Sequence, residues 1–276
     1  MRLKSFAKIN LTLRVLKKLK TGMHNIETHS TLIDLYDEIN IRKNKKDVIT
    51  FSGKFKNKVN TKKNSIIDTL YLLRKFKIIH NFYKIVIKKN IPVYAGLGGG
   101  TSNSLSIARY FLKNGFNKKL LNAFEEKIGS DFRLFLKKNS FQKNLKRVFK
   151  IRNNIRSYVL LVYPNINCKT KNTYKIIKSY SSRSSVNYFK KLSRKKYIET
   201  IKKDRNDLQK IVEKKYLSIS ILLKFIGELE GCIFSRMTGS GSVCYGVFKS
   251  KKTAKFAMAN LKRKYRKYWC VITKTI

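Results

Sequence analysis

The chain has 276 residues, of which 42% are hydrophobic, so it can bury a core in one large domain or two smaller ones. Its 64 Lys and Arg residues against 15 Asp and Glu give a formal net charge of +49. Because the lysines are dispersed rather than gathered in one block, the charge is weak evidence for nucleic-acid binding. The absence of a long apolar run and of a CxxC pair predicts a cytoplasmic protein without a membrane partner or a structural zinc site.

The amino-terminal part is predicted to be β-structure followed by a helix. Residues 6–16 alternate between apolar and polar side chains, which is typical of a half-buried strand. After a turn, residues 23–41 are expected to form a second strand, a loop and a short third strand that continues into 47–53, as an antiparallel meander. Apolar residues at helical spacing predict a helix over 64–77, and residues 83–91 alternate again as a strand.

The middle of the chain is predicted to be helical around a glycine-rich loop. Helices are expected over 104–114 and 117–128, and the stretch 131–138 is expected to start another. A domain boundary is predicted at residues 154 and 155, just before the apolar strand 159–164.

The carboxyl-terminal part is predicted to be an α+β sandwich. Several helices are expected between about 168 and 230, followed by strands over 232–237 and 243–248, a helix over 251–265 and a last strand over 269–276. This order suggests a ferredoxin-like domain spanning 155–276, after an amino-terminal domain spanning 1–154.

The strongest functional signal is the loop of residues 96–103, which contains Gly96, Gly98, Gly99 and Gly100 between a strand and a helix. Glycines let the backbone approach a ligand, and a helix start offers unpaired N–H groups and the positive end of the helix dipole. The loop is therefore interpreted as a phosphate cradle. A tight turn without a ligand is the alternative, and the spacing fits neither Walker A nor GxGxxG.

Three segments resemble the motifs of the GHMP kinases, in that family's order. They are AKINLTLRV with TGMHNIETHSTLIDLYDEI, PVYAGLGGGTSN, and SRMTGSGSVCYGVF. The first resembles most the diphosphocytidyl-methylerythritol kinases of that family. The resemblance implies an α+β fold with a ribosomal S5 domain 2-like amino-terminal domain and a ferredoxin-like carboxyl-terminal domain. It also implies ATP-dependent phosphorylation of the 2-hydroxyl of 4-diphosphocytidyl-2-C-methyl-D-erythritol, a cytidine diphosphate-linked sugar alcohol, with ATP and Mg²⁺.

The resemblance also implies two catalytic residues. Lys8 is the active-site lysine by resemblance, although a solvated surface lysine is the alternative in so basic a chain. Asp131, in GSDFRLFL, matches the aspartate that takes the proton from the substrate hydroxyl; as the residue before a predicted helix it could also be an N-cap. The family has a proline where this chain has Arg133, and a glycine-rich hairpin where this chain has the lysine-rich segment 141–150.

The implied substrate site depends on residues in both halves of the chain. His24 contacts the cytosine by resemblance, and Met23 stands where the family usually has a stacking tyrosine. Tyr174 is expected either to stack on the cytosine or to fill a helix core. The substrate-binding residues are thus Asn10, Met23, His24, Thr170 and Tyr174.

The ATP-binding residues implied by the resemblance gather around the two glycine-rich loops, with Asn64 near the adenine or, alternatively, as a helix N-cap. They are Pro92, Val93, Tyr94, Ala95, Gly96, Leu97, Gly98, Gly99, Gly100, Thr101, Ser102, Asn103, Asn64, Gly239, Ser240 and Gly241. Residues 238–242 would close over the phosphates, or form a plain hairpin loop. No metal site made by the protein alone is predicted; Mg²⁺ would arrive on ATP, with Thr101 or Ser102 as a candidate ligand.

Two alternative functions remain open from the sequence. One is a GHMP kinase of the mevalonate or homoserine type, against which the AKIN and MHNIET segments speak. The other is a basic RNA-binding protein, which accounts for the net charge of +49 but not for the glycines at 96–100. A monomer or a homodimer is expected.

Overall fold

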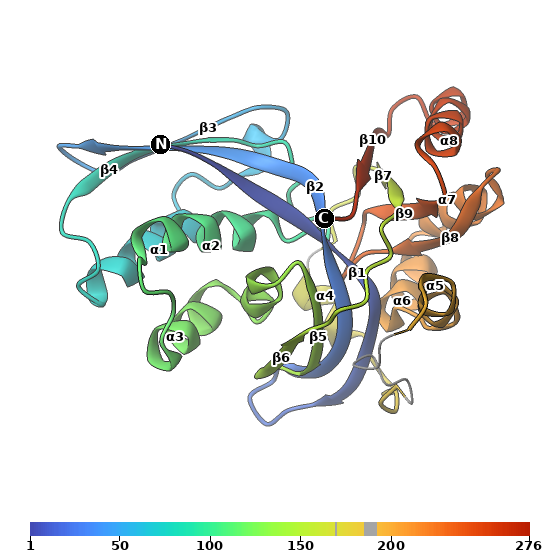
Figure 1. Ribbon diagram of the computed structural model, residues 1–276, viewed down its shortest axis with the longest axis horizontal. Helices are drawn as coiled ribbons and strands as arrows, with labels where there is room; N and C mark the ends of the chain where they lie inside the picture. The colour runs from blue at the N-terminus through green and yellow to red at the C-terminus, as the bar shows by residue number, and fades with distance from the viewer. Residues whose placement is uncertain (169, 185–191) are drawn as a thin grey trace. The chain divides into compact units, whose positions relative to one another are not determined.

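The computed structural model describes residues 1–168, 170–184 and 192–276 (Figure 1). Its contacts divide the chain into two compact units: unit 1 is residues 1–8, 35–93 and 98–136, and unit 2 is residues 9–34, 94–97 and 137–276. Two long strands, β1 (Arg2–Lys18) and β2 (His24–Asn44), contribute to both units. The units therefore interleave along the chain, and the boundary at residues 154 and 155 stays a prediction.

Unit 1 contains a β-α-β arrangement next to β2. Strand β3 (Val48–Ser52) pairs in parallel with β4 (Phe82–Lys88), and β4 pairs antiparallel with the second half of β2. Helix α1 (Ser65–Lys75) connects β3 to β4, which is the crossover that a parallel pair requires. The predicted meander is therefore wrong at β3. The loop expected within 23–41 is also wrong, because β2 runs unbroken from His24 to Asn44.

The helices of unit 1 follow the predicted periodicity. Helix α1 buries Ile66, Leu70 and Leu73, and it packs against α2 (Gly99–Phe111) and α3 (Lys118–Ile128). Helix α2 begins inside the glycine-rich loop, earlier than predicted. The helix expected over 131–138 is a short 3-10 helix, η2 (Phe132–Leu136), because Asn139 already pairs with Thr31 as a strand. A second 3-10 helix, η1, covers Lys56–Lys58.

Unit 2 contains the sheet of the predicted sandwich. Its strands are β7 (Tyr158–Tyr163), β8 (Cys232–Met237), β9 (Cys244–Phe248) and β10 (Trp269–Lys274), in the spatial order β10-β7-β9-β8 and all antiparallel. Helix α8 (Lys251–Lys264) connects β9 to β10. Numbered along the chain, this order is 4-1-3-2 for a β-α-β-β-α-β sequence, the arrangement of a ferredoxin-like sandwich. The ferredoxin-like prediction is confirmed.

Helices fill the connection between β7 and β8, as predicted. They are α4 (Thr170–Lys175), α5 (Arg194–Lys203), α6 (Asp207–Lys215) and α7 (Leu217–Glu228). Their apolar faces form one core with the sheet and with β1, which contributes Leu13 and Val15. The lysine-rich segment at 141–150 forms a hairpin of β5 (Asn139–Asn144) and β6 (Arg147–Lys150).

Among the residues that the structure describes, every helix is too short or too polar to cross a bilayer. The four cysteines are free thiols.

Candidate functional site

The glycine-rich loop opens helix α2 in unit 1. Gly98 is the N-cap of the helix and has φ +67°, a left-handed conformation. A Cβ atom at this position would lie 2.5 Å from Cζ of Phe135 and 3.3 Å from Oδ2 of Asp131, so only glycine fits without displacement. Helix α2 thus presents its first N–H groups and its dipole close to the Asp131 carboxylate, as a phosphate-binding helix start would.

Lys8 and Asp131 lie close enough in unit 1 to interact electrostatically. The Lys8 side chain is only 5% exposed, so it is not the solvated lysine that composition alone would suggest. Burial lowers the pKa of Lys8, and the charge of Asp131 opposes this shift by favouring the ammonium form. A buried cation beside a carboxylate at a helix start is a suitable arrangement for handling a phosphoryl group.

The Asp131 carboxylate is held by the loop rather than by the 3-10 helix that follows it. Thr101 Oγ1 donates a hydrogen bond to Asp131 Oδ1 at 3.0 Å. The next loop residue, Ser102, donates to the Phe6 carbonyl at 2.6 Å, which ties the loop to β1 two residues before Lys8. The loop therefore orients both predicted catalytic residues within unit 1.

Arg133, which stands where the family has a proline, binds two side chains of α3. The Arg133 guanidinium forms an ion pair with Glu125 and a hydrogen bond to the Asn122 carboxamide at 3.0 Å, both on α3. The short helix that starts beside Asp131 is thus fixed to α3 by side chains.

The second glycine-rich loop lies against Gly96 in unit 2. Gly96 has φ +80°, and a Cβ atom there would lie 2.2 Å from the Thr238 carbonyl oxygen. The Thr238 hydroxyl donates to the Gly96 carbonyl at 3.3 Å. The backbone N–H of Asn10 also bonds to the Thr238 hydroxyl, at 3.0 Å. Strand β1, the start of the first loop and the second loop therefore meet.

Sequence reasoning missed Asn206, which supports this second loop. Its carboxamide donates to the carbonyls of Met237 at 2.8 Å and Gly239 at 2.9 Å, while its Oδ1 caps α6 by accepting from Leu208 N–H. Asparagine before a helix signals only an N-cap in the sequence. The predicted substrate residue Thr170 reaches the same loop through its hydroxyl, 2.9 Å from the Ser240 hydroxyl.

The predicted base-recognition residues gather in unit 2. The His24 ring lies 5.1 Å from the Tyr174 ring and 6.2 Å from the ring of Tyr180, a residue that belongs to none of the sequence motifs. Burial, together with the charge of Lys18, lowers the pKa of His24, so its imidazole is neutral at neutral pH. Met23 is 50% exposed beside it.

Asn10, by contrast, is buried in unit 2. Its carboxamide donates to the Thr28 hydroxyl at 2.8 Å, and its backbone carbonyl accepts from the Tyr245 hydroxyl at 3.0 Å. It therefore links β1 to β2 and to β9.

Asn64 is a helix N-cap in unit 1, one of its two predicted roles. Its Oδ1 accepts from the N–H groups of Ile66 at 3.0 Å and Ile67 at 3.2 Å. The following residue, Ser65, donates to the Gly100 carbonyl at 3.0 Å, which connects this cap to the phosphate loop. The other predicted role of Asn64, near the adenine, stays a prediction.

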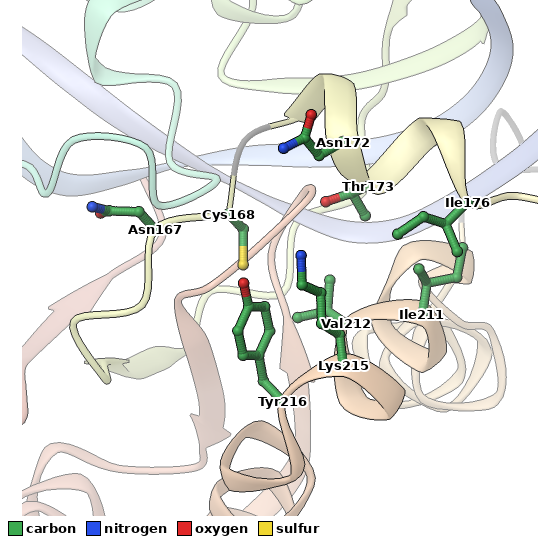
Figure 2. Close-up of a pocket in the computed structure, with 9 residues that line it drawn as sticks. All are labelled: Asn167, Cys168, Asn172, Thr173, Ile176, Ile211, Val212, Lys215 and Tyr216. Atoms are coloured by element: carbon green, nitrogen blue, oxygen red, sulfur yellow. The ribbon is translucent and has the colours of Figure 1, made fainter.

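Unit 2 also contains a cavity of about 200 Å³ (Figure 2). The Tyr216 hydroxyl points toward the Cys168 sulfur there. Burial raises the pKa of the Cys168 thiol, so the thiol stays protonated and is a poor nucleophile. No predicted site residue is among the lining residues described, which are Asn167, Cys168, Asn172, Thr173, Ile176, Ile211, Val212, Lys215 and Tyr216.

Known sequences place this geometry in context. The family model described as "GHMP kinases N terminal domain" matches residues 62–131, and "GHMP kinases C terminal" matches residues 189–267. The 4-diphosphocytidyl-2-C-methyl-D-erythritol kinase of Pelagibacter ubique (strain HTCC1062) is 35% identical, with 100% of this chain and 99% of the relative covered. The enzyme of that name from Prochlorococcus marinus (strain AS9601) is 32% identical, with 92% and 87% covered.

Solved structures show the same fold. A crystal structure of 4-(cytidine 5'-diphospho)-2C-methyl-D-erythritol kinase superposes with a TM-score of 0.76 at 18% identity, covering 99% of each chain. The mevalonate kinase of Methanococcus jannaschii superposes with a TM-score of 0.64 at 16% identity, covering 100% of this chain and 98% of the other.

Proposed function

Because the chain belongs to the GHMP kinase family, we propose that it transfers the γ-phosphoryl group of ATP to the 2-hydroxyl of 4-diphosphocytidyl-2-C-methyl-D-erythritol. The observation that carries this function is the 35% identity over the whole chain to a relative of that name. Family membership also confirms the predicted α+β fold with GHMP amino- and carboxyl-terminal domains, and the use of ATP.

The first glycine-rich loop binds the ATP phosphates in this proposal. Gly98 opens α2 in a left-handed conformation, and the helix start supplies N–H donors to the phosphate oxygens. Phosphoryl transfer demands mainly positioning and charge neutralisation, which such a loop provides. Within unit 2, Asn206 supports the loop of residues 238–242, whose contact with the phosphates stays a prediction.

Asp131 acts as the general base toward the substrate hydroxyl, and Lys8 orients the reactants. The hydrogen bond from Thr101 fixes the carboxylate at 3.0 Å, and the interaction with Lys8 keeps a cation beside it. Such a cation can offset the negative charge of the phosphoryl group during its transfer.

The residues around Asp131 fit a Mg²⁺ ion that binds together with ATP. The Thr101 hydroxyl and the Asp131 carboxylate are oxygen ligands of the kind that Mg²⁺ prefers. Within the described ranges, no group of three or more His, Cys, Asp and Glu side chains could hold a metal by itself. Bound Mg²⁺ would neutralise phosphate charge.

Recognition of the cytidine end falls to residues of unit 2. His24 and Tyr174 present neighbouring rings to the base, Met23 contributes a weaker thioether contact, and Thr170 contributes a hydroxyl. Asn10 is buried and bonded to Thr28, so its contact with the substrate stays a prediction. We place the reaction in the cytoplasm, because the four cysteines are free thiols, the form that a reducing compartment maintains.

A coupled assay tests the function directly. Purified protein is supplied with ATP, Mg²⁺ and one alcohol at a time: diphosphocytidyl-methylerythritol, mevalonate or homoserine. ADP release is expected with the first alcohol, and phosphorus NMR should locate the new phosphate on the 2-hydroxyl. Turnover with mevalonate or homoserine alone would assign the fold a different substrate.

A further inference from the structure

We infer that Tyr180 is a further specificity residue of the proposed kinase, whose ring stacks on the cytosine of the substrate. This inference rests on the proposed function. Tyr180 lies 6.2 Å from His24, between ring centroids and at an interplanar angle of 39°, and Tyr174 lies 5.1 Å from the same ring at 31°. Both separations fall within the range of aromatic contacts. His24 therefore belongs to a cluster of three rings rather than a pair.

The cluster is open to a ligand. Tyr180 is 45% exposed, and Met23, beside His24 in the chain, is 50% exposed. A tyrosine ring needs no such exposure if it only fills a core. An accessible aromatic face next to a neutral imidazole suits a planar heterocycle, because every nucleobase offers a π-face for stacking. Met23 presents a thioether, which has no aromatic face, so the second tyrosine supplies what the methionine lacks.

Tyr180 is held in place by the residues that follow it. Ser181 N–H donates to the Val15 carbonyl on β1 at 2.8 Å, and the Ser181 hydroxyl donates to the Asp207 carboxylate at 2.7 Å. The same carboxylate oxygen accepts from Val15 N–H at 2.7 Å. Arg205 donates to the Ser181 hydroxyl at 2.8 Å. The backbone at Tyr180 is therefore fixed to the strand that leads to His24.

The segment continues in an anchored path beyond Ser181. Arg14 donates to the Ser182 carbonyl at 3.3 Å, and Ser184 N–H donates to the Glu27 carboxylate at 2.8 Å. Glu27 belongs to β2, three residues after His24, so both strands of the amino-terminal hairpin bind this segment. The backbone next to Tyr180 is thus held in place before a ligand binds, which limits the entropy lost when a base stacks on the ring.

Two substitutions separate stacking from packing. Tyr180→Phe keeps the ring and Tyr180→Leu keeps an apolar side chain without a π-face. For Tyr180→Leu we expect the KM for diphosphocytidyl-methylerythritol to rise about tenfold, within the range measured for base–aromatic stacking. The KM for ATP and kcat should stay unchanged, and Tyr180→Phe should resemble the wild type. Tyr71→Leu is the control, since Tyr71 is 54% exposed on α1 and belongs to no proposed site.

Calorimetric titration of wild type, Tyr180→Leu and Tyr180→Phe with cytidine monophosphate gives a readout that does not depend on turnover. Weaker binding by Tyr180→Leu alone, with unchanged thermal unfolding, supports the inference. Equal KM and equal affinity in wild type and Tyr180→Leu would overturn it, as would a Tyr180→Phe defect as large as that of Tyr180→Leu. A wild-type protein that fails to phosphorylate diphosphocytidyl-methylerythritol would instead contradict the proposed function.

Discussion

Unit 1 and unit 2 contribute different kinds of functional group. In unit 1 a single loop and the residues it touches bring together the predicted phosphate cradle, Lys8 and Asp131. In unit 2 the rings of His24, Tyr174 and Tyr180 come from β2 and from the segment around α4, more than 140 residues apart in the chain. Tertiary structure assembles both sets, but the set in unit 1 is organised around one contiguous loop, whereas the ring cluster in unit 2 has no contiguous centre.

The sharpest test of this division is Asp131→Asn. The asparagine can still accept the hydrogen bond from Thr101, but it cannot take up a proton from the substrate hydroxyl. We expect kcat to fall by about 10²–10⁴-fold, the usual contribution of a general base, with the KM for ATP nearly unchanged. Steady-state kinetics with both substrates measures this. An Asn variant with wild-type turnover would remove the chemical role from unit 1.

Gly96→Ala tests the close approach of Gly96 to Thr238, both of which lie in unit 2. The new Cβ would lie 2.2 Å from the backbone oxygen of Thr238, which cannot rotate away. Gly22→Ala is a matched control, since Gly22 has the same φ of +80° but nothing within 4 Å. We expect Gly96→Ala to lose about 1–3 kcal/mol more unfolding free energy than the control, with a raised KM for ATP. Urea unfolding and kinetics measure both. Equal losses in the two variants would show that the contact with Thr238 is unimportant.

Acid should destabilise unit 2 through His29. Burial lowers the pKa of His29 to about 3, and its ring is bonded to the Tyr197 hydroxyl. Below pH 6.5 the His29 imidazole binds a proton in the unfolded state but stays neutral in the folded state, so the free energy of unfolding decreases as pH falls. The loss is about 1.4 kcal/mol per pH unit, or about 2 kcal/mol at pH 5.

Urea unfolding at pH 7.5 and pH 5 measures this loss, with His29→Gln as the comparison. The glutamine does not titrate in this range, so its variant should lose about 2 kcal/mol less between the two pH values. Equal losses in wild type and variant would show that His29 is not the group responsible.

The smallest effect is expected for Asn64→Ala, which tests two roles in unit 1. Removing an N-cap costs about 1 kcal/mol of stability. Asn117→Ala is the control, because Asn117 caps α3 through Leu120 N–H. A rise in the KM for ATP in Asn64→Ala alone would show that Asn64 also contacts the nucleotide. Equal kinetics in the two variants would leave it as a cap only.

Hydrophobic periodicity predicted most of the fold. The strands at the start, the helices α1 and α3 and the ferredoxin-like order followed from side-chain spacing. The pairing partner of β3 did not, because alternation along a strand reports a buried face and not its neighbour. The 3-10 helix at Phe132–Leu136 was missed for a related reason: its apolar residues fit a longer helix, and only pairing at Asn139 ends it.

The candidate site was predictable where its residues are contiguous. The glycines of the loop at 96–103 identify it in the sequence. The hydrogen bond from Thr101 to Asp131 was not predictable from the motifs, because it joins two segments that are separate in the chain. Tyr180 and Asn206 carry no local signal. A tyrosine in a basic segment and an asparagine before a helix are common, and their positions near His24 and Gly239 depend on tertiary packing.

The interleaving of the units has a consequence for synthesis on the ribosome. All segments of unit 1 precede residue 137, so this unit can close while the remainder is still being translated. Unit 2 needs residues 9–34 together with strands as late as β10. Leu13 and Val15 on β1 belong to a core whose other members lie at residue 160 and beyond, so this part of β1 is synthesised long before the core can form. Nascent chains are therefore most vulnerable to aggregation after unit 1 has emerged and before the strands of unit 2 have followed.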